Sequence, residues 1–425
     1  MSRTAEASSG DGARRRGKAV APYIFGVGAI WLAWQVMLQP VIQRGPPEIA
    51  VRLDPGSSMV LRRAAESELL AAETDNSAVV RHVENAAELG RQALARAPFD
   101  VRALRVIGLS EARSGREQAA DDLLTLAGNW SLRDDPTHAW LVDHRLRRGD
   151  YASALAHADT LIRRRDNLRP QVFQLFSTAA MQDPQRAMPV VARLIAARPP
   201  WRQAYLDSLY RTNEGMQLAI NLAVVLKHGE VPLSPAEQSQ MYYQLLDKGL
   251  VQGADALRTA LDGADVAASV TNGDFDDAET PEPFQWKLAQ QAGVSAEITP
   301  DDARPQDLAL RVEYDGYTSS RIAQQLMFLK PGHYRLTYQT RMESGAPPER
   351  LNWTLLCIPG EFPVLSAPAA PRQNRAWTTA ELEFTVPERC AGQWLNLDGG
   401  GGERRTPSVL WFDKITAKLI VSRNN

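Results

Sequence analysis

Residues 101–130, VRALRVIGLSEARSGREQAADDLLTLAGNW, decide the fold of the first half of the chain. Counted from the first of them, the stretch places apolar and small residues at set positions: Leu104 at 4, Ile107 at 7, Gly108 at 8, Gly115 at 15, Ala120 at 20, Leu124 at 24 and Ala127 at 27. Many of these positions are filled in the same way in segments that begin near residues 67, 135 and 169, in one constant register. A period of this length is typical of repeats in which each unit is one helical hairpin.

The repeat resembles the tetratricopeptide repeat, in which small residues at positions 8 and 20 let the two helices of a hairpin approach closely. The second unit matches closely, whereas the fourth has Phe176 and Met188 where Gly and Ala are usual. Further along, Ser234-Pro235-Ala236-Glu237 has the form of a capping box that opens another helix. We therefore expect a helical repeat domain, all-α, over residues 57–264.

The resemblance also implies a binding surface, because the concave face of such a solenoid commonly holds extended peptides or partner proteins. Two basic clusters would suit an acidic partner there: Arg145, Arg147 and Arg148, and Arg163 to Arg165. The alternative is that these side chains are solvated helix ends and faces. The formal net charge of -2 argues against nucleic acid as a partner.

A membrane anchor is predicted before the repeats. Residues 19–38, AVAPYIFGVGAIWLAWQVML, contain no charged side chain. A helix of that length covers about 30 Å, the thickness of the hydrocarbon core of a bilayer. Basic residues lie immediately before it, at Arg14, Arg15, Arg16 and Lys18, and the next one after it is Arg44.

The positive-inside rule then places residues 1–18 in the cytoplasm as a basic tail and the bulk of the chain in the periplasm of a bacterium. The alternative, a cleaved signal peptide, would have a shorter apolar run followed by a small-residue cleavage site, which the segment after Leu38 does not offer. We expect a single-pass inner-membrane protein in which residues 39–56 form a linker.

Beyond residue 265 the pattern changes. Aromatic residues become frequent, and alternating segments are separated by Pro, Gly and Asp turns. Candidate strands lie at residues 307–314, 333–341, 351–357, 378–386, 393–397 and 409–420. Many short strands with such turns predict an all-β jelly-roll sandwich over residues 265–425.

This region resembles a jelly-roll carbohydrate-binding module. Thr271-Asn272-Gly273-Asp274-Phe275, followed by Pro283-Phe284-Gln285-Trp286, is similar to the opening strand and turn of such modules, and Leu410 to Ile415 to their closing strand. The resemblance implies glycan binding and a structural calcium ion, since hard oxygen ligands suit calcium. The positions that match its ligands are Asn272, Asp274, Asp276 and Asp413. No other cofactor is expected.

Sugar recognition needs exposed aromatic faces and planar polar groups for hydroxyls. Trp286 and Trp411 lie within the family's core motifs, and Trp353 and Trp394 sit in alternating strands that suit burial. The candidates for an open glycan-binding face are Tyr314, Tyr317, Arg321, Gln324, Gln325 and Tyr338. The alternative is that these residues, too, are structural.

The two cysteines, Cys357 and Cys390, both fall in the β region. In an oxidising compartment they would form a disulfide, and the alternative is a pair of thiols in the strand core. The chain has no nucleophile elbow, no His-Glu-x-x-His and no P-loop, so we expect no catalysis.

Together these features predict a membrane-anchored periplasmic scaffold in envelope or exopolysaccharide assembly or secretion, binding a partner protein through the repeats and glycan through the sandwich. The combination is similar to accessory proteins of bacterial exopolysaccharide gene clusters. One alternative is a purely protein–protein scaffold whose sandwich binds no sugar. Another is a glycan-modifying enzyme, which would need two carboxylates close together in a cleft.

Overall fold

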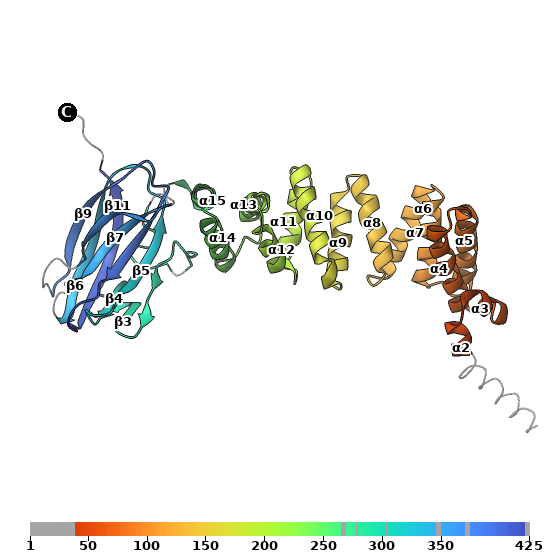
Figure 1. Cartoon of the computed structure of the whole chain (residues 1–425), viewed down its shortest axis with the longest axis horizontal. Coiled ribbons are helices and arrows are strands. Elements are labelled where there is room, and N and C mark those ends of the chain that lie inside the picture. Colours follow the sequence, from red (N-terminus) through yellow and green to blue (C-terminus); the bar gives the residue numbers. More distant parts are fainter. Residues whose placement is uncertain are drawn as a thin grey trace, which may run out of the picture. The chain divides into compact units, whose positions relative to one another are not determined.

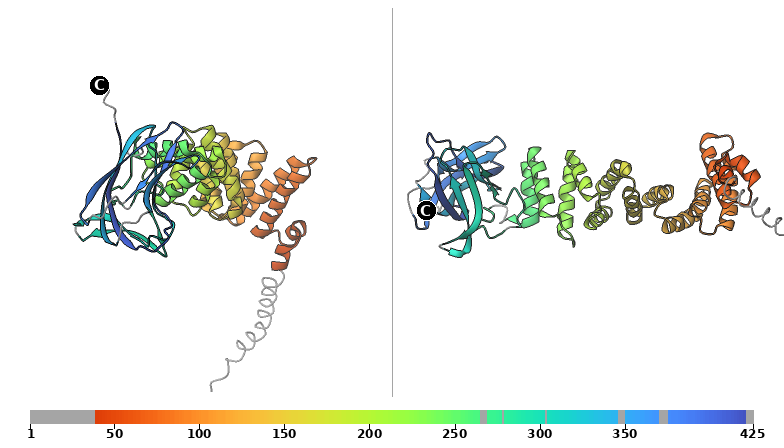
Figure 2. Two further views of the ribbon diagram at one scale, coloured as in Figure 1. Left: turned by 60° about the vertical axis from the view of Figure 1, so that its left-hand side comes forward. Right: turned by 90° about the horizontal axis from the view of Figure 1, so that it is seen from below.

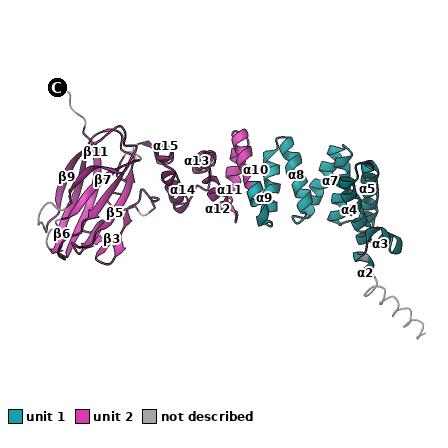
Figure 3. Cartoon of the chain, viewed as in Figure 1, with its two compact units in different colours: residues 1–172 teal, residues 173–425 magenta. Residues whose placement is uncertain are grey.

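The computed structural model describes residues 39–264, 269–277, 279–302, 304–345, 350–369 and 375–420. The chain is helical first and then an antiparallel β-sandwich (Figure 1). It divides into two compact units, residues 1–172 and 173–425 (Figure 3). The expected membrane segment, residues 19–38, and the basic tail before it lie outside the described residues. No helix within the described part is long and apolar enough to span a bilayer.

The helices follow one another with short connections. Those of the first unit are α2 (Gln39–Arg44), α3 (Pro47–Leu53), α4 (Ser58–Thr74), α5 (Val79–Arg96), α6 (Val101–Arg113), α7 (Glu117–Trp130), α8 (Asp135–Arg147) and α9 (Tyr151–Ile162). A 3-10 turn, η2 (Asp166–Leu168), leads into α10 (Arg169–Gln182), which crosses the boundary between the units. The second unit continues with α11 (Met188–Ala196), α12 (Arg202–Leu209), α13 (Asn213–Lys227), α14 (Pro235–Asp247) and α15 (Val251–Asp262).

The predicted period is visible in the helix starts, since α6, α8 and α10 begin 34 residues apart. Two boundaries differ from the prediction. Helix α4 begins at Ser58, next to the expected start of the helical domain at residue 57 but ahead of the repeat register near residue 67; Pro55-Gly56 forms a turn and Ser57 is the N-cap of the helix. The expected linker, residues 39–56, contains α2 and α3. Pro47 at the first helical position, with Glu48 behind it, favours the start of α3.

The hairpin of α6 and α7 shows why the repeat has particular residues at fixed positions. Asp100 caps α6 by accepting hydrogen bonds from the backbone N–H groups of Arg102 and Ala103. A Cβ atom added at Gly108 would lie 2.7 Å from Cγ of Leu124 on α7. The absence of a side chain at this position therefore lets the two helices pack closely.

Replacing Gly108 by alanine is expected to lower the free energy of unfolding by about 1–3 kcal/mol, because the added methyl group overpacks the contact with Leu124. The measurement is urea unfolding followed by the helical circular-dichroism signal. Gly253→Ala on α15 is the matched control, because its Cβ meets only ordinary contacts at 3.5 Å or more. That change should leave stability equal or raise it by up to about 1 kcal/mol. Equal losses in the two variants would contradict the packing argument.

Two histidines couple α8 to α9. The Nδ1 atoms of His138 and His157 lie 3.0 Å apart, and Nε2 of His138 lies 3.2 Å from the carbonyl oxygen of Ser131. Burial, together with the neighbouring His138 and Arg145, lowers the pKa of His157 to about 4. Burial also lowers the pKa of His138. The pair is therefore neutral at pH 7.

This pair predicts a loss of stability in acid. A histidine with a lowered folded pKa binds its proton more readily when unfolded, so its contribution is intact above the unfolded pKa of about 6.5. The contribution falls as the pH drops from there toward the folded pKa of about 4. We expect His157→Gln to flatten the stability profile across this window, as measured by urea unfolding at successive pH values. A variant profile as steep as that of the wild type would contradict this assignment.

The sandwich consists of two sheets that lie face to face (Figure 2). The five-stranded sheet has the order β1 (Lys287–Leu288), β5 (Ser320–Met327), β10 (Gly392–Gly399), β7 (Leu351–Ile358) and β8 (Phe362–Pro368). The six-stranded sheet has the order β2 (Gln290–Gln291), β3 (Val294–Asp301), β4 (Arg304–Tyr314), β11 (Ser408–Leu419), β6 (Gly332–Gly345) and β9 (Thr378–Val386). Neighbouring strands pair antiparallel throughout the described residues.

The core between the sheets is built on aromatic rings. Trp353 of β7 is fully buried and contacts the rings of Trp286, Tyr338 and Phe412. A disulfide joins Cys357, at the end of β7, to Cys390, with their Cα atoms 5.2 Å apart. Because a disulfide restricts the unfolded chain, this one adds to the stability of the sandwich.

Candidate functional site

The outward surface of the five-stranded sheet carries an aromatic side chain surrounded by polar ones. In β10, with the sequence GQWLNLDG, Leu395 and Leu397 belong to the core. Because side chains alternate between the two faces of a strand, Trp394, Asn396 and Asp398 point away from the core. Trp394 is partly exposed.

The strand register aligns further polar residues with these three. Asn396 lies opposite Gln324 of β5 and opposite Thr354 of β7. The same row ends at Lys287 of β1 and Ser366 of β8. Directly paired residues share a face of an antiparallel sheet, so this row of polar side chains crosses all five strands at about 4.8 Å per strand.

Two more rows flank the first, each about 7 Å away. In one, Asp398 lies opposite Arg321 and Asn352, and in the other Trp394 lies opposite Leu326 and Leu356. We call the surface formed by the three rows the open face. Its exposed or partly exposed members are Lys287, Arg321, Gln324, Asn352, Thr354, Leu356, Ser366, Trp394 and Asp398, whereas Leu326 and Asn396 of the same rows are fully buried.

Hydrogen bonds order the polar part of the open face. The hydroxyl of Thr354 donates to Oδ2 of Asp398 (2.5 Å), and Nε of Arg321 donates to Oδ1 of the same carboxylate (3.3 Å). Nδ2 of Asn396 donates to Oγ1 of Thr354 (3.4 Å). Oδ1 of Asn396 is buried and accepts no hydrogen bond from any described residue. Asn396 is 0% exposed, so this acceptor lies beneath the surface and out of reach of a ligand.

Three of the six predicted glycan candidates lie at the surface. Arg321 is exposed and Gln324 partly exposed, and both belong to the open face. Tyr317 is 50% exposed in the turn that leads into β5. Asp315 fixes this turn by accepting hydrogen bonds from the backbone N–H groups of Tyr317 and Thr318.

The other three candidates are buried, which corrects the prediction. Tyr338 is fully buried, and its hydroxyl donates to the carbonyl oxygen of Ala369 (3.0 Å). Tyr314 is 2% exposed, and its hydroxyl donates to the carbonyl oxygen of Gly400. Gln325 faces the interior, where its side chain accepts from and donates to the backbone of Thr271 (2.9 and 2.7 Å). Each lies on the strand face that turns inward.

Trp394, Asn396 and Asp398 of β10 are absent from the predicted candidates, because a tryptophan in an alternating strand suits burial. The signal was nevertheless present, since leucines at 395 and 397 occupy the inward positions and leave the other set outside.

The outer surface of the six-stranded sheet is closed by side chains stacked on one another. The guanidinium carbons of Arg341 and Arg304 lie 5.7 and 4.0 Å from the ring centre of Trp377, and Arg341 also lies 4.9 Å from that of Trp411. Trp411 is thus buried, 3% exposed, but on the outer side of its sheet. Such cation–π contacts are worth about 0.5–2 kcal/mol each. Trp411 therefore offers no free face to a sugar, whereas Trp377 stays partly exposed.

The predicted calcium ligands come from neighbouring segments, since the backbone N–H of Ile415 donates to the carbonyl oxygen of Gly273 (2.8 Å), but Asn272 and Asp413 have other partners. Asp413 is buried against Arg304, whose Nη2 lies 2.9 Å from its Oδ2. Asn272 donates to Oε1 of Gln285 (2.9 Å) and to a backbone carbonyl, while Asp274 and Asp276 are exposed. Among the described residues, no group of three or more His, Cys, Asp or Glu could hold a metal ion. The implied ligands therefore do not fit calcium.

A hollow of about 680 Å³ lies beside β4 and β11, with Glu313 and Asp315 in its lining. Two carboxylates in a cleft would suit a glycosidase, which needs one of them to act as a general acid with a raised pKa. Although partial burial acts to raise the pKa of Asp315, hydrogen bonds from Thr318 and Tyr317 hold it below its usual value. Glu313 forms an ion pair with Arg311 at 2.6 Å. These contacts give Asp315 the electrostatics of a turn residue rather than those of an acid catalyst.

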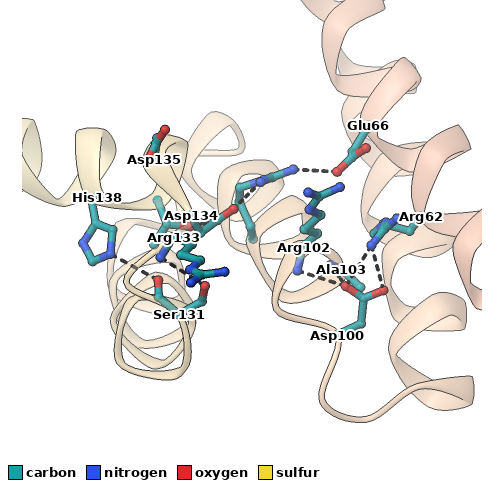
Figure 4. Close-up of polar contacts among 12 residues, drawn as sticks. Arg62, Glu66, Asp100, Arg102, Ala103, Ser131, Arg133, Asp134, Asp135 and His138 are labelled. Atoms are coloured by element: carbon teal, nitrogen blue, oxygen red, sulfur yellow. Dashed lines mark hydrogen bonds and ion pairs between the residues drawn. The ribbon is translucent and has the colours of Figure 1, made fainter. Parts of the chain in front are cut away.

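The first unit offers a separate groove, of about 540 Å³, along α4, α6 and the start of α8 (Figure 4). Most charges in it are paired, as Arg105 is with Glu66 at 2.5 Å and Arg165 with Asp135 at 2.7 Å. Two further cations in the lining, those of Arg102 and Arg133, are exposed and form no ion pair within the described chain.

The basic clusters singled out from the sequence are, by contrast, mostly paired. Arg163 meets Asp159 at 2.8 Å, and Arg164 and Arg165 meet Asp135 at 2.7 Å. Arg145 meets Asp121 at 2.6 Å. Arg163 pairs within its own helix end, whereas Arg145, Arg164 and Arg165 pair with carboxylates of neighbouring helices. Their ion partners therefore lie within the helical region, as the alternative interpretation of these clusters implies.

No protein-family model matches the chain, and no curated protein is significantly similar to it. Several solved structures are similar in fold to its C-terminal β-sandwich. A structure described as "CBM4 structure and function" is 16% identical, covering 36% of this chain and 99% of the other, with a TM-score of 0.27. The CBM22-1 xylan-binding domain of Xyn10C from Paenibacillus barcinonensis is 10% identical, covering 33% and 88%, with a TM-score of 0.25. TmCBM61, solved with β-1,4-galactotriose, is 15% identical, covering 35% and 97%, with a TM-score of 0.23. The chain is thus a helical region followed by a sandwich that resembles carbohydrate-binding modules at low identity.

Proposed function

We propose that this chain is a non-catalytic, membrane-anchored scaffold of the bacterial envelope that binds a polysaccharide through the open face and a partner protein through its helical repeats. The observation that carries the glycan-binding part is Trp394, partly exposed in the middle strand of its sheet and flanked by amide, hydroxyl and charged groups. A tryptophan ring offers a flat apolar surface to the C–H face of a sugar, and the partly exposed amide of Gln324 and carboxylate of Asp398 suit its hydroxyls.

The partner-binding part is supported by the groove of the first unit. Arg102 and Arg133 are cations without ion partners, and Leu70 beside them is 63% exposed. Together they suit an extended acidic segment with apolar side chains. Membrane anchorage and a periplasmic location are supported by the charge-free residues 19–38 and the basic residues before them. Involvement in exopolysaccharide assembly or secretion follows from combining the three parts.

The glycan-binding part is tested by affinity electrophoresis of the whole chain in gels that contain a panel of neutral and acidic bacterial polysaccharides, with and without calcium. The whole chain is preferred to residues 265–425 because helices α14 and α15 cover Phe284 of the sandwich. Retardation by at least one polymer, equal in both calcium conditions, is the expected result. No retardation by any polymer, from chain shown to be folded, would favour the protein-only scaffold.

The partner-binding part is tested with a glutamate-rich peptide. Arg102→Glu combined with Arg133→Glu should weaken its binding at least tenfold, because two attractive charges become repulsive. Arg147→Glu combined with Arg148→Glu is the matched control, since these exposed arginines lie outside the groove lining. If both pairs weaken binding equally, only the net charge matters and the groove is not the site.

A further inference from the structure

The open face continues one row beyond Asp398. Gly399 turns inward, where an added Cβ atom would lie 2.9 Å from the ring of Tyr314, so Gly400 points outward. The backbone N–H of Gly400 donates to the carbonyl oxygen of Arg350 (2.7 Å), and a Cβ atom on Gly400 would lie 2.9 Å from that of Arg350. Gly400 is partly exposed and Arg350 exposed. This further row is therefore open to solvent, and its charged member is an arginine.

The loop that follows β10, residues 400–406, is held against this end of the face. The guanidinium of Arg350 donates to the carbonyl oxygen of Gly401. At the other end of the loop, the backbone N–H of Thr406 donates to the carbonyl oxygen of Asp315 (2.9 Å). Because both ends are fixed, the side chains of the loop lie beside the open face.

Three arginines at this end have no carboxylate partner. Arg350, Arg404 and Arg405 are exposed, and none of them forms an ion pair with a described residue. The guanidinium carbon of Arg405 lies 5.8 Å from the ring centre of Tyr317, which is half-exposed. Glu403 is the one carboxylate in the sequence of the loop.

The neighbouring carboxylates are already engaged elsewhere. Asp398 accepts hydrogen bonds from Thr354 and Arg321. Asp315 accepts them from the backbone N–H groups of Tyr317 and Thr318 (2.9 and 2.8 Å). A negatively charged group on a ligand would therefore meet guanidinium groups that no described carboxylate of the chain occupies.

We infer that the polysaccharide bound by the open face is acidic, with sugar rings at Trp394 and carboxylate or phosphate groups of the same polymer at Arg350 and Arg405. The planar guanidinium group binds both kinds of anion through two parallel hydrogen bonds. Gly400 is six residues from Trp394, about 20 Å along the strand, so the ligand is an extended chain and not a single sugar. This inference rests on the proposed glycan-binding function and names the class of polymer.

The first test changes the ligand. Each polysaccharide that the whole chain retains in the panel is compared with two treated forms, one with its carboxyl groups reduced to alcohols and one dephosphorylated with hydrofluoric acid. Calorimetric titration should show binding about tenfold weaker for the form that has lost its anionic groups. Raising the salt from about 20 to about 500 mM should weaken binding of the untreated polymer, because salt screens exposed charges.

The result of this comparison also identifies the anion. Loss of affinity on carboxyl reduction indicates a uronic acid or a similar carboxylate, and loss on dephosphorylation indicates a phosphate. Equal affinity for all three forms, or retention of neutral polymers alone, would overturn the inference while leaving the proposed function intact. Failure of every polymer to bind would instead remove the proposed function itself.

The second test changes the protein. Arg350→Gln combined with Arg405→Gln should weaken binding of the untreated polymer about tenfold, a loss of about 1.4 kcal/mol. The same variant should bind the neutralised polymer as the wild type does, which also shows that it is folded. Arg335→Gln combined with Lys418→Gln is the matched control, because these exposed residues pair across β6 and β11 of the other sheet. Equal losses in the two double variants would mean that only net charge matters, and would overturn the site.

Discussion

Trp394→Ala is expected to weaken polysaccharide binding by about 30-fold or more, whatever the length of the ligand. A partly exposed aromatic ring at the centre of a binding surface is a typical hot spot, and truncation of such a residue costs about 2 kcal/mol or more. Trp394→Phe should recover part of the affinity because it keeps a flat ring. The measurement is titration of the retained polysaccharide into the whole chain.

The control for that experiment is another exposed tryptophan. Trp130 is 44% exposed at the end of α7 in the first unit, far along the sequence from the open face. Trp130→Ala should leave sugar affinity unchanged. If Trp394→Ala bound as tightly as the wild type, the open face would not be the glycan site, and Tyr317→Ala would then test the adjoining turn.

Arg341→Met is expected to lower the free energy of unfolding of the sandwich by about 3 kcal/mol. Arg341 is 12% exposed, its guanidinium lies beside the rings of Trp377 and Trp411, and it is the ion partner of the fully buried Asp301. Breaking a buried ion pair costs about 3–5 kcal/mol. The loss here lies at the low end of that range, because Arg304 (3.8 Å) and Nε1 of Trp377 (2.8 Å) still contact the Asp301 carboxylate. Denaturant unfolding followed by tryptophan fluorescence measures the loss.

Arg335→Met provides the matched control on the same strand and the same face. Arg335 is 44% exposed and pairs with Glu383 and Glu381, which are about half exposed. Exposed ion pairs are worth at most about 1 kcal/mol, so this variant should lose little. Similar losses of unfolding free energy in the two variants would show that the contacts of Arg341 stabilise the sandwich no more than an exposed ion pair does.

The helical half of the molecule could be predicted further than the sandwich because its signals are local. The spacing of small residues such as Gly108 and Ala120 specifies which helices meet and how closely. In the structure Gly108 packs directly against Leu124, and Ala120 is fully buried. In contrast, the role of Asp413 depends on Arg304, a residue on another strand. Without the strand register, a carboxylate in the closing strand could equally be a metal ligand or an ion partner.

The candidate site shows the same limit at a finer scale. Arg321 and Gln324 were predicted from their chemistry and do lie on the open face, while the neighbouring Gln325 turns inward. A shift of one residue moves a side chain to the other face of a sheet. The register of β5 is itself irregular opposite the Leu397–Asp398 step of β10, which defeats simple counting. The alternation of the leucines in β10 predicts more reliably which side chains face outward.

The ring contacts and ion pairs around Phe284 have a mechanical consequence. A polymer held at Trp394 and drawn away from the cell would pull on β10 and, through the sandwich, on the joint between Phe284, Tyr242 and Arg258. The ion pair between Lys330 and Asp255 adds a further contact between the helices and the sandwich. Tension would therefore be distributed over several contacts and not act on one peptide linker alone. The sandwich and the last two helices would thus resist traction as a single piece.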